Sequence, residues 1–266
     1  MIKIEPEICS PIYKKTHKRY SCYTSQHLKE LKKKNNISRK QKVKSVSPVG
    51  IWKELNTVLQ ECKKESCWAK QLGLKFNDAF APTMPSSWKS NEDEWLSSTD
   101  ITSVLRQYEK AYPDFKYLGP SPSDYYVKEV DGRCVWQDIC DFNVTTTKHA
   151  YIGIVFNLDT HEGPGTHWVS MFVDIKKKII YYFDSTGEDI HENIHHLVDQ
   201  IQGQDNSFKL ITNHPVEHQF GNTECGIYTL FFIITMLKTR NFSFFNGKKT
   251  FPDKKMLKLR KKIFNS

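Results

Sequence analysis

The segment His218–Gly226, with the sequence HQFGNTECG, closes a polar loop and opens the most apolar run of the chain, Ile227 to Leu237. This run is too long for a typical buried strand and too short to span a bilayer, so we expect a helix that is buried on most sides. Thr223 is a suitable N-cap and would place Cys225 in the first turn. The unpaired backbone N–H groups and the helix dipole at that position favour an anion, so a thiolate there is a better-populated nucleophile. An inert buried cysteine is the alternative, but the glycine after Cys225 and the polar or small residues before it argue against simple core filling.

The composition is that of a globular protein with ample core. The chain has 266 residues, of which 38% are hydrophobic and 13% aromatic, enough for one large domain or a domain with an extension. It has no apolar run of membrane-spanning length and no signal-peptide core near its start, so we expect no membrane association. The seven cysteines are irregularly spaced, which in the absence of a secretion signal predicts reduced thiols.

The net charge of +9 is concentrated at the two ends of the chain. Residues 1–50 hold 13 Lys and Arg against 3 Asp and Glu, and residues 248–266 hold 8 against 1. The remaining residues, 51–247, therefore carry 18 basic against 26 acidic side chains. Basic ends are compatible with weak attachment to DNA or another acidic surface, although solvated, solubilising ends are the simpler interpretation.

We expect a basic, partly helical N-terminal extension over residues 1–90 and one catalytic domain over residues 91–266. Residues 1–21 have the charges and prolines of a loosely ordered arm. Hydrophobic periodicity and capping residues predict helices over 22–34, 51–74, 93–112, 189–202 and 251–264. Buried strands are predicted over 151–158, 167–175, 179–183 and 208–213, and a hairpin over 127–135. The glycine and prolines of residues 117–124 indicate a turn-rich crossing.

The two strands 167–175 and 179–183 are joined by three lysines, and their register decides whether two polar residues meet. With a two-residue turn at Lys176-Lys177, Val169 opposes Asp184, and His167 and Asp184 share one face at the same end of the hairpin. A three-residue turn would put them on opposite faces. The sequence has no Asn-Gly pair to settle the turn.

With the two-residue turn, the chain supplies a nucleophile, a base and an orienting carboxylate for acyl transfer. The Cys225 thiolate would attack a peptide carbonyl, His167 would protonate the leaving amine, and Asp184 would fix the imidazole tautomer. The side-chain amide of Gln219, with the backbone N–H of Cys225, would stabilise the oxyanion. Each residue also has a simpler interpretation: His167 as an ordinary hydrogen-bonding residue, Asp184 as a turn former and Gln219 as a solvated loop residue.

The ordered set of residues resembles the ubiquitin-like-protein (SUMO) protease family and the adenovirus-type proteases. The matching features are His167-Trp168, Asp184 seventeen residues later, and Gln219 six residues before Cys225-Gly226. Three further segments look like those of the virion polyprotein-processing proteases of asfarviruses, mimiviruses and iridoviruses: residues 95–101, 117–124 and 222–226.

This resemblance implies an α+β fold with a papain-like core, in which a central mixed sheet packs on a buried helix that starts at the catalytic cysteine. It implies a cysteine endopeptidase that cleaves after Gly-Gly, with Trp95 and Trp168 clamping the glycine pair; core packing is the alternative for both indoles. We expect a monomer without a bound cofactor, and the resemblance to adenovirus-type proteases leaves activation by a cofactor open. Asn222 is an alternative oxyanion donor to Gln219. The expected substrates are viral structural polyproteins, processed during maturation in the virion and the host cytoplasm. SUMO or ubiquitin-like protein processing is the alternative substrate class.

Two other functions are weighed against this one. His191-Glu192-Asn193-Ile194-His195 matches the HExxH signature of zinc proteases, but the only later glutamates lie in the loop before Cys225, and we predict no metal site. The pairs Cys62/Cys67 and Cys134/Cys140 lack the spacing or histidine partners of a convincing metal site. A non-enzymatic nucleic-acid-binding module would use the basic ends and would not need Cys225.

Overall fold

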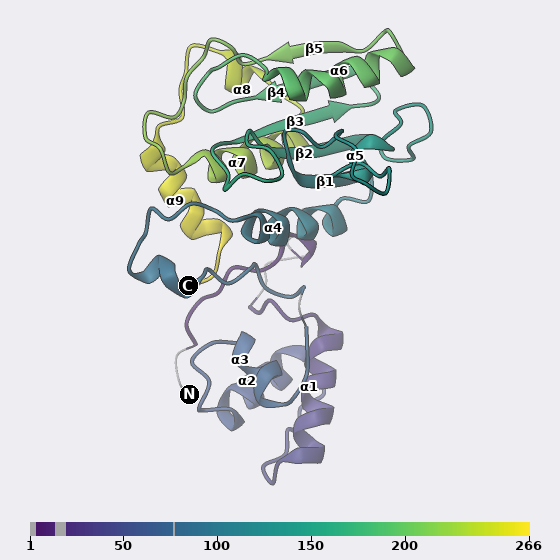
Figure 1. The fold of residues 1–266 in the computed structure, drawn as a ribbon. Coiled ribbons are helices and arrows are strands. Elements are labelled where there is room, and N and C mark those ends of the chain that lie inside the picture. Colours follow the sequence, from purple (N-terminus) through teal and green to yellow (C-terminus); the bar gives the residue numbers. More distant parts are fainter. Residues whose placement is uncertain (1–3, 14–19, 77) are drawn as a thin grey trace. The chain divides into compact units, whose positions relative to one another are not determined.

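The computed structural model of the chain describes residues 4–13, 20–76 and 78–266, and it divides into two compact units (Figure 1). Unit 1 comprises Met1–Thr83 with Lys262–Ser266, and unit 2 comprises Met84–Lys261. No helix among the described residues is both long enough and apolar enough to cross a bilayer.

Unit 1 is a small helical assembly. It contains the 3-10 helix η1 (Pro11–Tyr13) and the helices α1 (Ser25–Ser38), α2 (Pro48–Val58) and α3 (Ser66–Gln71). The Thr24 side chain accepts a hydrogen bond from the backbone N–H of His27 and caps α1, as the sequence predicts. The single helix predicted over residues 51–74 is wrong, because the chain turns between α2 and α3. The core of unit 1 is formed by buried apolar side chains, including Leu28, Leu31, Leu55, Leu59 and Trp68.

Six of the seven cysteines form disulfides, so the prediction of reduced thiols is wrong for all but Cys225. The pairs are Cys9–Cys22, Cys62–Cys67 and Cys134–Cys140. Their Cα atoms lie 5.1, 5.5 and 6.5 Å apart, within the range that a disulfide spans. The first pair joins residues that only the folded chain brings together, and this is why irregular spacing in the sequence did not reveal it. The pairs Cys62–Cys67 and Cys134–Cys140 are therefore not metal ligands.

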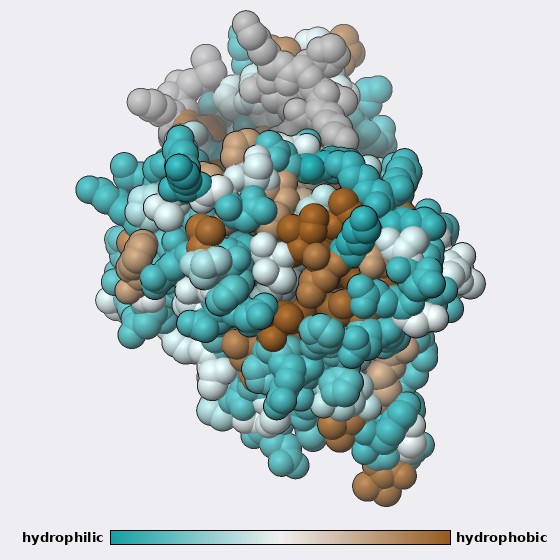
Figure 2. Space-filling model, turned by 90° about the horizontal axis from the view of Figure 1, so that it is seen from above, coloured by the Kyte–Doolittle hydropathy of each residue, from teal (hydrophilic) through white to brown (hydrophobic). Residues whose placement is uncertain are grey.

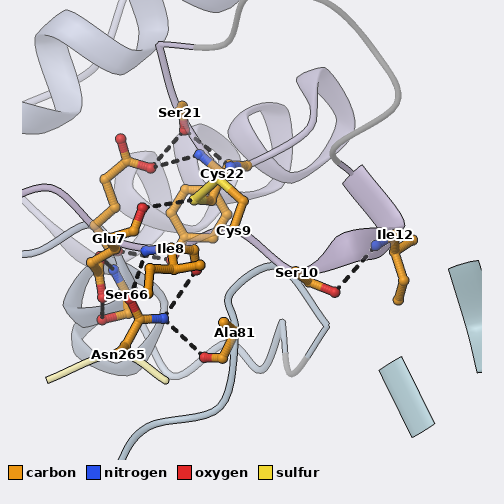
Figure 3. Close-up of a disulfide and its surroundings, with 12 residues drawn as sticks. Glu7, Ile8, Cys9, Ser10, Ile12, Ser21, Cys22, Ser66, Ala81 and Asn265 are labelled. Atoms are coloured by element: carbon orange, nitrogen blue, oxygen red, sulfur yellow. Dashed lines mark hydrogen bonds between the residues drawn. A yellow bond between two sulfur atoms is a disulfide. The ribbon is translucent and has the colours of Figure 1, made fainter. Parts of the chain in front are cut away.

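The described part of the first 21 residues is anchored, which corrects the prediction of a loose arm there; residues 1–3 and 14–19 lie outside the described residues. Figure 3 shows the Cys9–Cys22 disulfide among hydrogen bonds to segments distant in the sequence. The Ile8 N–H donates to Asn265 Oδ1 at 2.6 Å, and the Ser66 hydroxyl donates to the carboxylate of Glu7 at 2.6 Å. Residues 4–13 thus belong to unit 1 through covalent and polar contacts together.

Unit 2 is built on one mixed five-stranded sheet. The strands are β1 (Phe115–Pro122), β2 (Tyr151–Asn157), β3 (Trp168–Asp174), β4 (Ile179–Phe183) and β5 (Lys209–Thr212), and they lie side by side in this order. The pairs β1–β2 and β4–β5 are parallel, whereas β3 is antiparallel to both of its neighbours. Six helices and one 3-10 helix complete the unit: η2 (Ser86–Lys89), α4 (Ser98–Ala111), α5 (Gln137–Cys140), α6 (Glu192–Gln204), α7 (Cys225–Thr239), α8 (Ser243–Asn246) and α9 (Asp253–Ile263).

Helices cover both faces of the sheet. The long helix α7 packs against β3 and β2 and also contacts α4 (Figure 1). Apolar side chains of α6, including Ile194, Leu197 and Ile201, pack with residues such as Ile154 and Met171 in the second core layer. Every residue of β3 is buried, and α7 is buried on most sides, as predicted from its continuous apolar run. Hydrophilic side chains cover most of the face in Figure 2, with apolar side chains gathered near its middle. The predicted α+β class is confirmed.

Two local predictions are wrong. Residues 117–124 belong largely to strand β1, which tolerates Pro120 and Pro122 because it lies at the edge of the sheet and pairs only with β2. Its register shifts between Leu118 and Ser121, where the glycine and proline fall. The N-cap of α7 is Glu224, one residue later than the predicted Thr223, so that Cys225 is the first residue of the helix.

Candidate active site

The β3–β4 hairpin has the register that brings His167 and Asp184 together. Ser170 pairs with Phe183 and Asp174 with Ile179, which corresponds to a two-residue turn at Lys176-Lys177. His167 Nε2 lies 2.8 Å from Asp184 Oδ1. The conditional prediction from the sequence is confirmed in its geometry.

The Asp184 carboxylate is held rigidly by its surroundings. It is 1% exposed, and its Oδ1 accepts hydrogen bonds from the backbone N–H and the hydroxyl of Thr186, at 2.9 and 2.7 Å. The buried side chain of Asn213, at the end of β5, accepts from the Asp184 N–H at 2.9 Å and donates to its carbonyl at 2.7 Å. These bonds leave the carboxylate one orientation, toward His167.

His167 is partly buried, hydrogen-bonds to Asp184 and interacts with Cys225. Burial by itself would lower the pKa of His167, but hydrogen bonds to Asp184 and Cys225, with the negative charge of both partners, outweigh burial and raise it to about 10. Because Nε2 bonds to Asp184, Nδ1 is the ring nitrogen left for the sulfur. The raised pKa favours the imidazolium form of His167 at neutral pH.

Cys225 is the first residue of α7 and is 1% exposed. Gly226 allows the wall of the site to approach this point closely. A Cβ on Gly226 would lie 2.8 Å from Leu96 Cβ and 3.4 Å from Trp168 Cδ1, which is too close for any other residue without movement of the wall. The glycine that argued against core filling in the sequence therefore has a steric reason.

Gln219 lies in the site, not in solvent. Its side chain is buried, with Oε1 accepting from the Ser185 hydroxyl at 2.7 Å and Nε2 donating to the Gly221 carbonyl at 3.0 Å. The Ser185 carbonyl accepts the N–H groups of both His218 and Gln219 at 2.8 Å. Since Nε2 carries two hydrogens, one remains for a developing oxyanion. Asn222, the alternative donor, is exposed on the same loop.

The two tryptophans line one groove of about 680 Å³. Trp168 is buried and donates its Nε1–H to the Leu96 carbonyl at 3.0 Å, whereas Trp95 is 41% exposed. Leu96 and Trp168 also pack on Gly226, so the groove leads to the helix end that carries Cys225. Its other walls come from residues that include Pro120, Pro122, Trp136, His161 and Pro164.

The histidines of the HExxH sequence serve helix α6 instead of gathering in one place. His191 is the N-cap residue and accepts from the Asn193 N–H at 3.2 Å, while His195 pairs with Asp199 at 3.3 Å. Within the described part of the chain, no group of three or more metal-ligating side chains is found.

Sequence reasoning missed the residues that hold the site together. Ser185 ties the loop of Gln219 to the strand end of Asp184, and Asn213 fixes the Asp184 backbone. Ser185 follows Asp184 directly, but sequence reasoning assigned it no role in the site. Asn213 had no signal, because only the β4–β5 pairing brings it to Asp184.

The model of the Ulp1 protease family, C-terminal catalytic domain, matches residues 89–266. The chain belongs to the Ulp1 protease family. As a Ulp1-family protein it is a cysteine-type endopeptidase.

Its similar proteins include viral proteases. The chain is 33% identical to a protein of Acanthamoeba polyphaga mimivirus that is named as a thiol protease, over 64% of this chain and 57% of that protein. It is 26% identical to a cysteine protease of African swine fever virus, over 80% of this chain and 89% of that protein. The crystal structure of an ASFV protease has the same fold, with a TM-score of 0.67 at 20% identity, over 99% of this chain and 97% of that one.

Proposed function

We propose that this Ulp1-family endopeptidase uses Cys225, His167 and Asp184 as its catalytic triad and cleaves after Gly-Gly. The observation that carries the proposal is the His167–Asp184 pair at 2.8 Å, with Cys225, which interacts with the same imidazole, as the first residue of α7. The pair holds the imidazolium, the helix start favours the thiolate, and the two groups face each other.

The chemistry follows from these positions. The Cys225 thiolate attacks the scissile carbonyl, and the negative charge moves to the carbonyl oxygen. The Cys225 N–H and the second hydrogen of Gln219 Nε2 stabilise that oxyanion, with Asn222 as the alternative donor. His167 gives its proton to the leaving amine as the tetrahedral intermediate collapses to a thioester. Water, deprotonated by His167, then hydrolyses the thioester and restores the thiolate.

The preference for glycine rests on the close approach of the walls. Leu96 and Trp168 leave no free space for a Cβ at Gly226, and Trp95 lines the same groove. Flat indole rings on this path favour a substrate backbone without Cβ atoms, and they exclude water from the scissile bond.

The biological substrates that we propose are viral structural polyproteins, cleaved during maturation in the virion and the host cytoplasm. The similarity to proteases of two large DNA viruses supports this assignment. A role in processing SUMO or ubiquitin-like proteins is the alternative, since some relatives from African swine fever virus are named SUMO-1 cysteine proteases.

Cleavage assays with paired substrates test the proposal. Peptides containing Gly-Gly-X, matched peptides containing Gly-Ala-X, and SUMO and ubiquitin with C-terminal extensions would be incubated with wild type and Cys225→Ala. We expect wild type to cut the Gly-Gly-X peptide and spare the Gly-Ala-X peptide, and the variant to cut neither. Preferential cutting of the SUMO fusion would favour the alternative, and unchanged cleavage by Cys225→Ala would refute the proposed nucleophile.

Association of the basic ends with DNA is a secondary proposal. The lysines of α9 at positions 254, 255, 258, 261 and 262 are exposed, which supports a charged contact surface. Such binding should weaken steeply with salt. DNA binding unchanged by deletion of residues 1–50 together with neutralisation of these lysines would argue against it.

A further inference from the structure

Helix α9 holds the loop that precedes Cys225 through one carboxylate. Asp253 Oδ2 accepts hydrogen bonds from the N–H groups of Phe220 and Gly221, at 3.1 and 2.9 Å. The Phe220 side chain is 69% exposed, so little packing holds this part of the loop and the hydrogen bonds must do so. Gly221 in turn presents the carbonyl that orients the Gln219 amide. The position of the oxyanion donor therefore depends on Asp253.

The same contact extends to helix α7 and to the segment before α9. The Tyr228 hydroxyl, three residues after Cys225, lies 2.9 Å from Asp253 Oδ1 and 2.9 Å from the His218 carbonyl. Burial lowers the pKa of His218, whose neutral ring donates from Nε2 to the Phe245 carbonyl at 2.8 Å and accepts at Nδ1 from the Phe251 N–H at 3.2 Å. The loop is thus held at both ends by the C-terminal part of unit 2.

Farther along, α9 holds the opposite wall of the groove. The guanidinium of Arg260 donates to the carbonyls of Glu92 and Glu94, at 2.9 and 2.5 Å, and lies 3.6 Å from the ring centre of Trp88. Arg260 is only 6% exposed. Glu94 directly precedes Trp95, and Glu92 lies two residues before Glu94. Trp95 lines the groove, and the next residue, Leu96, also forms the wall beside Gly226.

Asp253 and Arg260 are seven residues apart, which places them about two turns apart on one face of the helix, with a rise of about 10 Å between them. We propose that α9 is a brace that sets the separation between the loop of Gln219, which precedes Cys225, and the groove wall that contains Trp95. Asp253 and Arg260 are then positioning residues for the reaction. The inference rests on the proposed function, because it assigns Gln219 and Trp95 their roles. It predicts that the two ends of the brace affect different kinetic constants.

Steady-state kinetics with a Gly-Gly-X peptide distinguish the effects of Asp253 and Arg260, at the two ends of the brace. Loss of one oxyanion donor costs about 10²–10³-fold in kcat, so a donor that is only misplaced should cost less. We expect Asp253→Ala to lower kcat about 10- to 100-fold at unchanged KM. Arg260→Lys, which keeps the charge but loses the fork to two carbonyls, should raise KM about tenfold at nearly unchanged kcat.

Two further variants distinguish positioning from general damage. Asp253→Asn keeps an oxygen toward Phe220 and Gly221 and should retain most of the wild-type kcat. Asp205→Ala removes a carboxylate that accepts the Ser207 N–H at 3.0 Å and pairs with Lys178, and it should leave both constants unchanged. A kcat of Asp253→Asn as low as that of Asp253→Ala would show that charge, not the hydrogen bonds, is what matters, and would overturn the positioning role.

Amide hydrogen exchange tests the brace independently of activity. In Asp253→Ala, exchange at Phe220 and Gly221 should accelerate while exchange in β3 stays at the wild-type rate; in Arg260→Lys, the acceleration should be confined to the segment before Trp95. Unchanged exchange at both places would overturn the inference even in an active enzyme. If wild type cleaves no Gly-Gly peptide but exchange changes as expected, the brace stands and the proposed substrate is what fails.

Discussion

Unit 2 contains two His–Asp pairs of nearly the same length, and only one of them has the surroundings of a catalytic pair. His167 Nε2 lies 2.8 Å from Asp184, and His161 Nδ1 lies 2.7 Å from Asp124. The side chains of the first pair are 18% and 2% exposed, against 35% and 9% for the second. The His161 N–H also donates to Asp124 at 2.9 Å, so the second pair fastens a loop.

The two pairs differ in the interactions that raise and lower the pKa of each histidine. The hydrogen bond to Asp124 is the main cause that raises the pKa of His161. For His167 burial is the largest influence and acts in the opposite direction, yet the pKa rises because Cys225 adds a second hydrogen bond and a second negative charge to those of Asp184. A His–Asp pair is common, whereas the proposed mechanism requires a buried one that also interacts with a cysteine at a helix start.

Alanine substitution of the two histidines should give the largest contrast. His167→Ala removes the proton donor for the leaving amine and should lower kcat by about 10²–10⁴-fold. His161→Ala should leave kcat at its wild-type value and affect only KM, since His161 lines the groove. Steady-state cleavage of a Gly-Gly-X peptide measures both constants. Equal losses of kcat would remove the distinction between the pairs.

Replacing the carboxylates should give the next largest contrast. The bond and charge of Asp184 raise the pKa of His167, so Asp184→Asn lowers that pKa and the imidazolium loses its proton at a lower pH. The alkaline limb of kcat/KM should therefore move to lower pH in Asp184→Asn and stay in place in Asp124→Asn. A pH–rate profile for the three proteins checks this, and an unmoved limb in Asp184→Asn would contradict the coupling.

A smaller effect should come from the close packing around Gly226, the residue after Cys225. A Cβ on Gly226 would lie 2.8 Å from Leu96 Cβ, so Gly226→Ala should displace the wall and lower stability by about 1–3 kcal/mol, with a raised KM. Gly203, in helix α6, has nothing within 4 Å of its added Cβ, and Gly203→Ala should be neutral or slightly stabilising. Urea unfolding of both variants would show whether the two glycines differ.

The smallest effect concerns the His161–Asp124 pair and the dependence of folding stability on pH. Because the pKa of His161 is raised in the folded state, its pairing with Asp124 stabilises the fold fully below the unfolded pKa and is lost as the pH rises through the folded value. The difference in urea midpoint between wild type and His161→Ala should therefore shrink from pH 5 to pH 9. A difference that grows with pH would have the wrong sign.

The sequence predicted best where one pattern sufficed. The apolar run after Cys225 predicted a buried helix, and the spacing of His167 and Asp184 predicted their meeting once the turn was specified. The edge strand β1 was missed because its prolines look like turn signals until its single partner is known. The Cys9–Cys22 disulfide, Asn213 and Asp253 were missed because each contact joins segments that only the folded chain brings together. The Cys62–Cys67 and Cys134–Cys140 disulfides are local, and they were missed because the lack of a secretion signal predicted reduced thiols.

The most direct test of the coupled site is an NMR titration of the His167 imidazole in wild type and in Cys225→Ala. With both partners present, the pKa of His167 should lie far above 6.5, toward about 10, and it should fall in Cys225→Ala because the sulfur's hydrogen bond and charge are lost. A His167 that titrates near 6.5 in wild type, or one whose pKa is the same in both proteins, would contradict a functional connection between Cys225, His167 and Asp184.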